Sequence, residues 1–105
     1  MQVQITFNIE LFPAEIEYTV LCGPYVGPLK FSRTNQNLLT GELNYQGVGS
    51  QILTHLKLER VNGTPYIEFN NGPSLYRAIF SEDLKTISGS AFYNNIWHPF
   101  TGVRK

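Results

Sequence analysis

Apolar and polar residues alternate with a period of two along almost the whole chain, and this pattern restricts the fold more than any other feature. In the first run, one phase holds Val3, Ile5, Phe7, Ile9 and Leu11, and the other holds Gln2, Gln4, Thr6, Asn8 and Glu10. Successive side chains of a β-strand point to opposite faces of its sheet, so this alternation is typical of a strand with one buried face. Because helical periodicity is nearly absent, the sequence predicts an all-β protein.

Turn-forming residues divide the alternating pattern into eight or nine strands. We expect strands at 2–11, 16–22, a short one from Leu29 to the polar run at Thr34, and then at 39–45, 51–61, 64–70, 74–81, 86–93 and 96–104. The first two are expected to pair as a hairpin around Pro13, because proline cannot donate to a strand ladder. Residues 23–28 are expected to form a glycine- and proline-rich loop with Tyr25 at its tip.

Two Asn-Gly pairs give the strongest local signals in the chain. Asn62-Gly63 and Asn71-Gly72 each lie between β-rich runs. Asn-Gly is the preferred centre of a type I′ hairpin turn, because both central residues take a positive φ. The pairs therefore predict a three-stranded meander over 52–81. On the strand 51–61, the residues Ile52, Leu56 and Leu58 are expected to face the core.

The connections predict how the strands are arranged. None is longer than about six residues, which is near the usual loop length and favours a meander over the crossovers of a β-sandwich. The pattern from Phe31 through Gly41 to Tyr45 recurs from Phe80 through Gly89 to Tyr93. Glycine inside a strand marks a bend, and bends at matching places help to close a sheet. We therefore expect an antiparallel meander of about eight strands forming a small barrel over residues 1–105 as a single domain, with a β-sandwich as the alternative.

The same segments resemble a known class of barrels. Leu39-Thr40-Gly41, Phe80-Ser81, Ile87-Ser88-Gly89 and the closing run Phe100 to Arg104 are similar to small up-and-down barrels of the calycin type, which include lipocalins, fatty-acid-binding proteins and avidin-like proteins. The resemblance covers roughly residues 29–105. The Gly-x-Trp opening of lipocalins is missing, and Trp97 is the only tryptophan, whereas an avidin-like biotin site uses several. The resemblance implies the barrel fold and leaves the ligand open.

Charge and cysteine content narrow the classes of partner. Eight acidic and eight basic residues give a net charge of zero, and the basic residues are scattered, so no nucleic-acid-binding face is expected. No apolar stretch approaches the ~18 residues that a membrane helix needs. Cys22 is the only cysteine, so an internal disulfide is impossible and a small core residue is expected. The first residues lack the basic and apolar regions of a signal peptide, so a cytoplasmic location is the default expectation.

Neither a metal site nor a catalytic motif is predicted, and no cofactor is expected. His55 and His98 are the only histidines, and with Cys22 they show no diagnostic ligand spacing. We expect His55 to lie on the solvent side of its strand. An enzyme working at a barrel mouth would draw on Glu68, Tyr93, His98 and Arg104, but no feature of the sequence positively supports this third reading.

Two non-enzymatic functions remain. The first is a barrel that binds a small apolar or amphipathic ligand, or a sugar, because tyrosine and tryptophan at strand ends suit such contacts. Its candidate ligand-binding residues are Tyr45, Glu68, Arg77, Tyr93, Trp97, His98 and Arg104. Glu68 and Arg77 form either a cross-strand pair or, if they point inward, a polar floor. The second function is a homo-oligomeric assembly module with a filled barrel, motivated by the strand 2–11, which needs a pairing partner.

Overall fold

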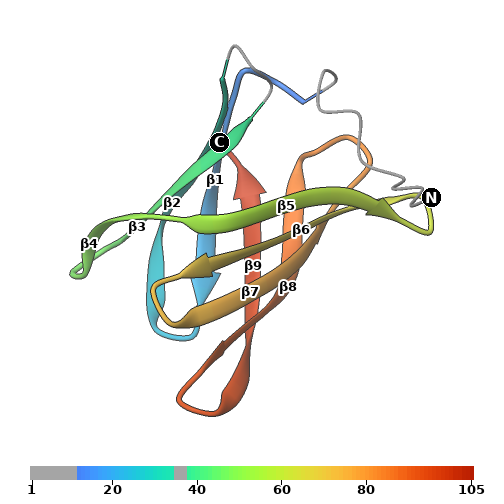
Figure 1. Cartoon of the computed structure of the whole chain (residues 1–105). Coiled ribbons are helices and arrows are strands. Elements are labelled where there is room, and N and C mark those ends of the chain that lie inside the picture. The colour runs from blue at the N-terminus through green and yellow to red at the C-terminus, as the bar shows by residue number, and fades with distance from the viewer. Residues whose placement is uncertain (1–11, 35–37) are drawn as a thin grey trace.

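The computed structural model describes residues 12–34 and 38–105, and it confirms the all-β prediction (Figure 1). The strands are β1 (Glu15–Cys22), β2 (Tyr25–Arg33), β3 (Leu39–Tyr45), β4 (Gly49–Ile52), β5 (Thr54–Val61), β6 (Thr64–Asn71), β7 (Ser74–Phe80), β8 (Thr86–Tyr93) and β9 (Ile96–Arg104). The expected strand at 2–11 lies outside the described residues. The described part holds no helix long and apolar enough to cross a membrane.

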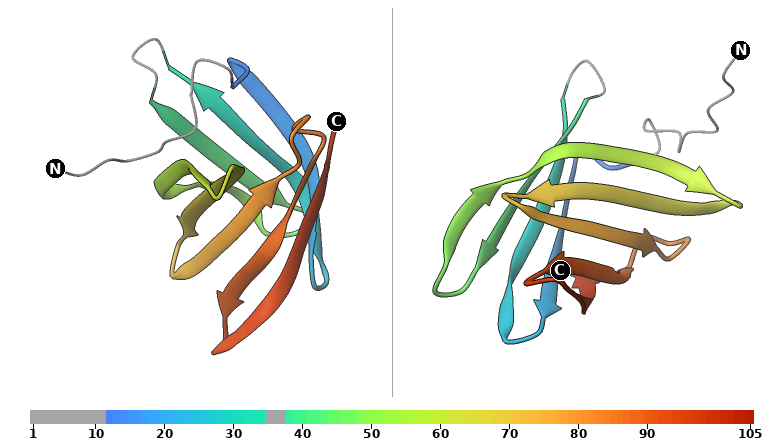
Figure 2. Two further views of the ribbon diagram at one scale, coloured as in Figure 1. Left: turned by 90° about the vertical axis from the view of Figure 1, so that its right-hand side faces the viewer. Right: turned by 60° about the horizontal axis from the view of Figure 1, so that its bottom comes forward.

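The nine strands of the described residues all belong to one antiparallel sheet. Their order is β4-β3-β2-β1-β9-β8-β7-β6-β5, so each strand pairs with its sequence neighbour except where β1 meets β9 and where β4 and β5 end the sheet. The two end strands follow one another in the chain with only Leu53 between them. The sheet therefore curls until β5, β6 and β7 run across β1, β2 and β9 (Figures 1 and 2). This is the expected meander in a nearly closed barrel, and the two separate sheets of a sandwich are not present in the described residues.

The predicted strand at 51–61 is bent rather than straight. Its first part, β4, pairs with β3, and its second part, β5, pairs with β6 after an irregularity between Thr54 and Lys57. His55 lies at this irregularity with a positive φ of 55°, and its side chain is exposed as expected, although Leu53, which shares its phase, is buried. The expectation that Ile52 faces the core is wrong, because the bend places Leu53 inward with 4% of its surface exposed and leaves Ile52 72% exposed.

One predicted connection differs from that observed, and a second involves residues outside the described part of the chain. The loop at 23–28 is only the two-residue turn Gly23-Pro24, and β2 already begins at Tyr25 opposite Cys22. Of the hairpin expected around Pro13, only β1 lies within the described residues, and its residues Tyr18–Cys22 pair with β2 on one side and with β9 on the other.

The second Asn-Gly pair forms a different turn from the first. Asn62 and Gly63 both have positive φ, as a type I′ turn requires. In the other hairpin, Asn71 pairs with Ser74, so the turn is Gly72-Pro73 with only Gly72 at positive φ. A turn centred on Asn71-Gly72 would need the N–H of residue 73 to close it, and proline has none. Asn71 is therefore the last residue of β6 rather than part of the turn.

The inward-facing side chains fill most of the barrel. The buried apolar residues are Phe12, Ile16, Tyr18, Val20, Cys22, Leu29, Phe31, Leu43, Tyr45, Leu53, Ile67, Phe69, Tyr76, Ala78, Phe80, Ile87, Ala91 and Phe100. Two strand glycines allow close packing: Gly41 makes room for the Phe31 ring on β2, and Gly89 lets the backbone of β7 approach at Arg77 and Ala78. A Cβ at Gly41 would come within 2.9 Å of the Leu53 side chain.

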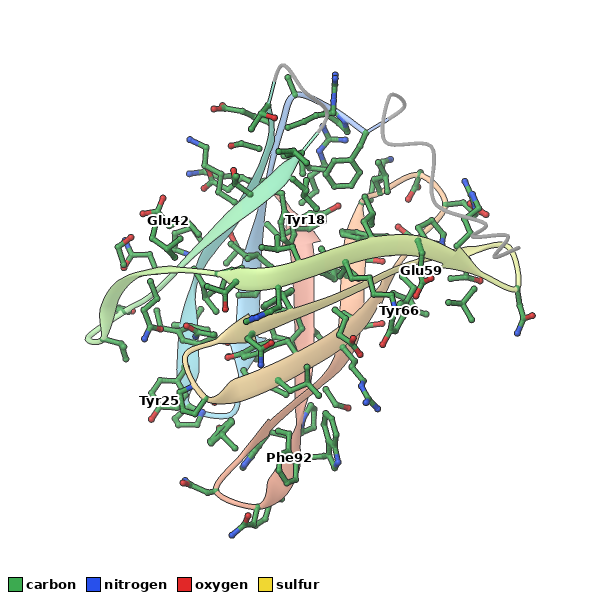
Figure 3. The ribbon with its side chains drawn as sticks, viewed as in Figure 1. Tyr18, Tyr25, Glu42, Glu59, Tyr66 and Phe92 are labelled. Carbon is green, nitrogen blue, oxygen red and sulfur yellow. The ribbon has the colours of Figure 1, made fainter. Side chains whose placement is uncertain are left out.

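The barrel has two unlike ends. At the first, which we call the closed end, the ring of Phe12 lies 5.7 Å from that of Phe80 and 6.4 Å from that of Phe31. The Tyr18 hydroxyl donates a hydrogen bond to the Leu84 carbonyl there, at 2.6 Å. The opposite end, which we call the open end, carries the turns between β1 and β2, β3 and β4, β6 and β7, and β8 and β9. Figure 3 shows Tyr18 toward the closed end and Tyr25 beside the β1–β2 turn at the open end.

Candidate functional site

A cavity of about 310 Å³ lies at the open end of the barrel. Its lining comes from four turns and the strand ends beside them: Tyr25, Tyr45, Val48, Gln51, Asn71, Pro73, Ser74, Tyr76, Tyr93 and Asn94. No charged residue is among them. The site therefore combines aromatic rings with uncharged hydrogen-bonding groups, which is the usual composition of a small-molecule pocket.

Four tyrosines form the aromatic part of the cavity. The ring of Tyr25 lies 5.4 Å from that of Tyr45, with the planes tilted by 33°, and 6.4 Å from that of Tyr93, nearly edge-on. The Tyr45 and Tyr76 hydroxyls share a hydrogen bond of 3.0 Å. Tyr45 and Tyr76 are buried, whereas Tyr25 exposes 37% of its surface. The rings thus form a continuous wall whose outer part faces solvent.

Asn71 contributes the one buried polar side chain of this wall. Its exposed fraction is 8%, and its Nδ2 donates a hydrogen bond of 3.0 Å to Oε1 of Gln51. Its Oδ1 is buried and has no hydrogen-bond partner, and it is the only such side-chain atom among the described residues. A buried carbonyl oxygen without a partner is costly, so this atom favours any ligand that brings a donor to it.

Burial sets the protonation of the titratable groups beneath the cavity. It raises the pKa of Tyr45 far above its ordinary value, and the hydrogen bond with Tyr76 raises it further. Burial likewise raises the pKa of Tyr76 and of the Cys22 thiol, which lies near Tyr45 and Tyr93. All of these groups are neutral near pH 7, so none is prepared to act as a base or a nucleophile.

The structure brings together some of the predicted ligand-binding residues. Tyr45 and Tyr93, which close the two copies of the recurring pattern, both line the cavity. His98 does not line the cavity, but it contacts a residue that does. Its ring stacks on that of Tyr93, with 3.8 Å between the ring centroids and 12° between the planes. Its Nε2 also lies 3.3 Å from the Tyr93 carbonyl oxygen.

The other predicted residues lie elsewhere. Glu68 and Arg77 form the cross-strand pair on the outer face, with 3.1 Å between Oε2 and Nε, rather than a polar floor. The Trp97 ring lies under the Arg77 guanidinium at 5.4 Å and beside Phe92 at 5.0 Å, on the opposite side of the β8–β9 hairpin from the cavity. Arg104 lies opposite Tyr18 toward the closed end.

Sequence reasoning missed Asn71 and Gln51 as parts of the site. The Asn-Gly pattern predicts a turn position for Asn71, and Pro73 is the signal that places it in the strand instead. Gln51 enters the site because the chain bends after β4, and this bend has no strong signature in the alternating pattern. Among residues 12–34 and 38–105, no group of three or more His, Cys, Asp or Glu side chains is placed to hold a metal ion.

Comparisons with known proteins find no match. No protein family, no curated protein and no solved structure is similar enough to this chain to be counted as related. The likeness to small β-barrels therefore rests on the strand order and the near closure of the sheet. The site must be interpreted from its own chemistry.

Proposed function

We propose that this protein is a non-enzymatic binding barrel that takes a small uncharged molecule at its open end. The observation that carries the proposal is the cavity of about 310 Å³ lined by four tyrosines and no charged residue. Pockets for small molecules start at about 300 Å³ and are mostly aromatic and apolar with a few placed polar groups. A charged ligand would find no counter-ion there and would lose its hydration, so a neutral one is favoured.

The same lining argues against catalysis. The Tyr45 and Tyr76 hydroxyls and the Cys22 thiol have pKa values raised by burial, so they do not give up protons readily near neutral pH. Of the four residues that an enzyme at the barrel mouth would use, only Tyr93 lines the cavity. Glu68 and Arg104 lie away from it, and His98 reaches it only through Tyr93.

The first test is native mass spectrometry of gently purified protein. We expect a small adduct that stays with the folded protein and is released on denaturation. Tyr25→Ala removes an exposed part of the cavity wall and should lower the retained fraction. Tyr66→Ala is the matched control, because Tyr66 is a half-buried tyrosine on the outer face, where its hydroxyl donates to Glu68. A clean apo mass with no binding of any added small molecule would contradict the proposal.

Self-assembly through a strand edge is the second candidate function. The observation in its favour is that β5 ends the described sheet, so it pairs with β6 on one side only. An unpaired edge is a template for another strand. Native mass spectrometry distinguishes the two functions, because a dimer that forms without any ligand favours assembly.

A further inference from the structure

We infer that the ligand of the open end is a neutral sugar, and that Asn71 selects it by accepting a hydrogen bond from one of its hydroxyl groups. The inference rests on the proposed function and adds to it the class of ligand and the residue that determines specificity. Three features of the cavity carry it: the unpartnered oxygen of Asn71, the arrangement of the tyrosine rings, and the unused bonding capacity of the tyrosine hydroxyls.

The Asn71 oxygen excludes a purely apolar ligand. Oδ1 is buried and unpartnered, while Nδ2 of the same amide is held by Gln51 at 3.0 Å, so the side chain is fixed in direction. A hydrocarbon in the cavity would bring no donor to this oxygen, so the cost of its unpaired burial would remain. A ligand with an O–H or N–H group would instead complete the bonding of this atom.

The tyrosine rings exclude a flat aromatic ligand held between two of them. Such a ligand needs about 7 Å between the flanking rings, twice a normal contact distance. Tyr25 and Tyr45 are 5.4 Å apart and already touch, and Tyr93 meets Tyr25 edge-on at 6.4 Å. The rings therefore offer one wall rather than a slot. A wall of aromatic faces suits the C–H face of a puckered sugar ring, which packs on one side only.

The hydroxyls provide the remaining polar contacts of a sugar. In the 3.0 Å pair between Tyr45 and Tyr76, one hydroxyl donates and the other accepts, which leaves one O–H that can turn to the Cys22 sulfur, to the Asn71 side chain or to a ligand. Ser74 and Asn94 add further uncharged donors and acceptors at the rim. Sugar hydroxyls both donate and accept, so they can match this mixed set, whereas a carboxylate or an ammonium group cannot.

The experiment is a protein-detected NMR titration at millimolar concentrations. The probes are glucose, galactose and N-acetylglucosamine as sugars, with toluene and dodecanoate as an apolar and an anionic comparison. We expect one or more of the sugars to shift the side-chain amide signals of Asn71, and the indole signal of Trp97, on the outer face, to stay unchanged. Toluene and dodecanoate are expected to leave the Asn71 signals in place.

Variants at two neighbouring asparagines test the role of Asn71. Asn71→Leu removes the acceptor and should weaken sugar binding about tenfold, as the loss of one hydrogen bond predicts. Asn71→Asp keeps an acceptor at the same place and should retain more of the affinity. Asn70→Leu is the matched control, because Asn70 is the preceding residue of β6 and does not line the cavity. Thermal melts establish that each variant is folded before it is titrated.

The outcomes separate this inference from the proposed function. Sugar binding that is unchanged in a folded Asn71→Leu variant overturns the role of Asn71. Shifts at the cavity with toluene or dodecanoate but with none of the sugars overturn the sugar assignment and leave a binding barrel in place. If none of the probes shifts a cavity signal, the inference is wrong, and the proposed function is then decided by the adduct measurement alone.

Discussion

The two ends of the barrel are built from similar aromatic side chains, yet only one of them is filled. At the closed end, Phe12, Phe31 and Phe80 contact one another edge-to-face and are almost completely buried. At the open end, Tyr25, Tyr45, Tyr76 and Tyr93 surround a cavity of about 310 Å³. The size of the ring is nearly the same in both sets, so the hydroxyl group is the chemical difference.

A hydroxyl changes how a ring can pack. A phenylalanine gains free energy by burying its whole surface, whereas a buried tyrosine must also find a hydrogen-bond partner for its tip. Tyr18, near the closed end, meets this need with the Leu84 carbonyl at 2.6 Å. At the open end, the Tyr45 and Tyr76 hydroxyls form a hydrogen bond with each other, and the cavity lies beside this pair. One end is therefore tightly packed, and the other retains a cavity.

The largest expected effect is the loss of Phe12 at the closed end. Phe12→Ala removes a ring that is 1% exposed and packs on two other rings, so it should lower the free energy of unfolding by about 3–5 kcal/mol. Tyr25→Ala at the open end should cost roughly 1 kcal/mol or less, since its ring is already 37% exposed. Urea denaturation measures both. Equal losses at the two ends would contradict the division of roles.

Alkaline pH tests the buried tyrosines at both ends. Burial raises the pKa of Tyr18 and of Tyr45 above the ordinary value of about 10. Below pH 10 these phenols are protonated in both the folded and the unfolded chain, so their contribution to stability is constant. Above pH 10 the unfolded chain loses these protons first, so the unfolding free energy should fall by up to about 1.4 kcal/mol per pH unit for each tyrosine.

The measurement is urea denaturation at several pH values between neutrality and the alkaline range. Tyr45→Phe should reduce the slope above pH 10, because one shifted group is removed from the balance. A folded variant that keeps the full slope would show that Tyr45 ionises as easily in the folded protein as in the unfolded chain.

Much of the barrel was predictable because the alternation of apolar and polar residues indicates the buried face of each strand. The phases of Tyr18, Ile67 and Phe69 each gave the buried face correctly. The prediction for Ile52 is wrong because one extra residue near His55 shifts the phase of the strand. The composition of 51–61 gives no sign of this extra residue. A bend that serves to close the barrel depends on partners far away in the chain, so local patterns do not specify it.

The candidate site was predictable only in part for a related reason. Tyr45 and Tyr93 were found because they end matching strands, which fold toward the same end of the barrel. Arg77 was a candidate as part of a polar floor with Glu68, and Trp97 as a ring for ligand stacking, but both lie on the outer face, and a shift of one residue in phase is enough to exchange the two faces of a strand. To predict Asn71 as part of the site, two turns that both contain Asn-Gly must be distinguished. In the second of them, Pro73 follows the pair and moves the turn one residue along the chain, to Gly72-Pro73.

A smaller effect is expected for single hydroxyls. Tyr18→Phe leaves the part-buried Leu84 carbonyl without its donor and should cost about 1–2 kcal/mol. Tyr45→Phe should cost less, because water can enter the open cavity and bond with the Tyr76 hydroxyl in place of the lost group. Urea denaturation near pH 7 compares the two variants. A larger cost at Tyr45 would mean that the open end is drier and more tightly packed than its lining indicates.

The smallest effect is expected at Trp97. Its ring is 44% exposed and contacts Phe92 and the Arg77 guanidinium, a cation–π contact worth about 0.5–1 kcal/mol at an exposed site. Trp97→Ala should therefore change stability by no more than roughly 1 kcal/mol. The sugar binding that we propose for the cavity should not change, because Trp97 lies on the opposite side of the β8–β9 hairpin from Tyr93. Calorimetric titration measures the affinity. If it falls, the ligand extends around this hairpin, and the outer face must be counted as part of the open end.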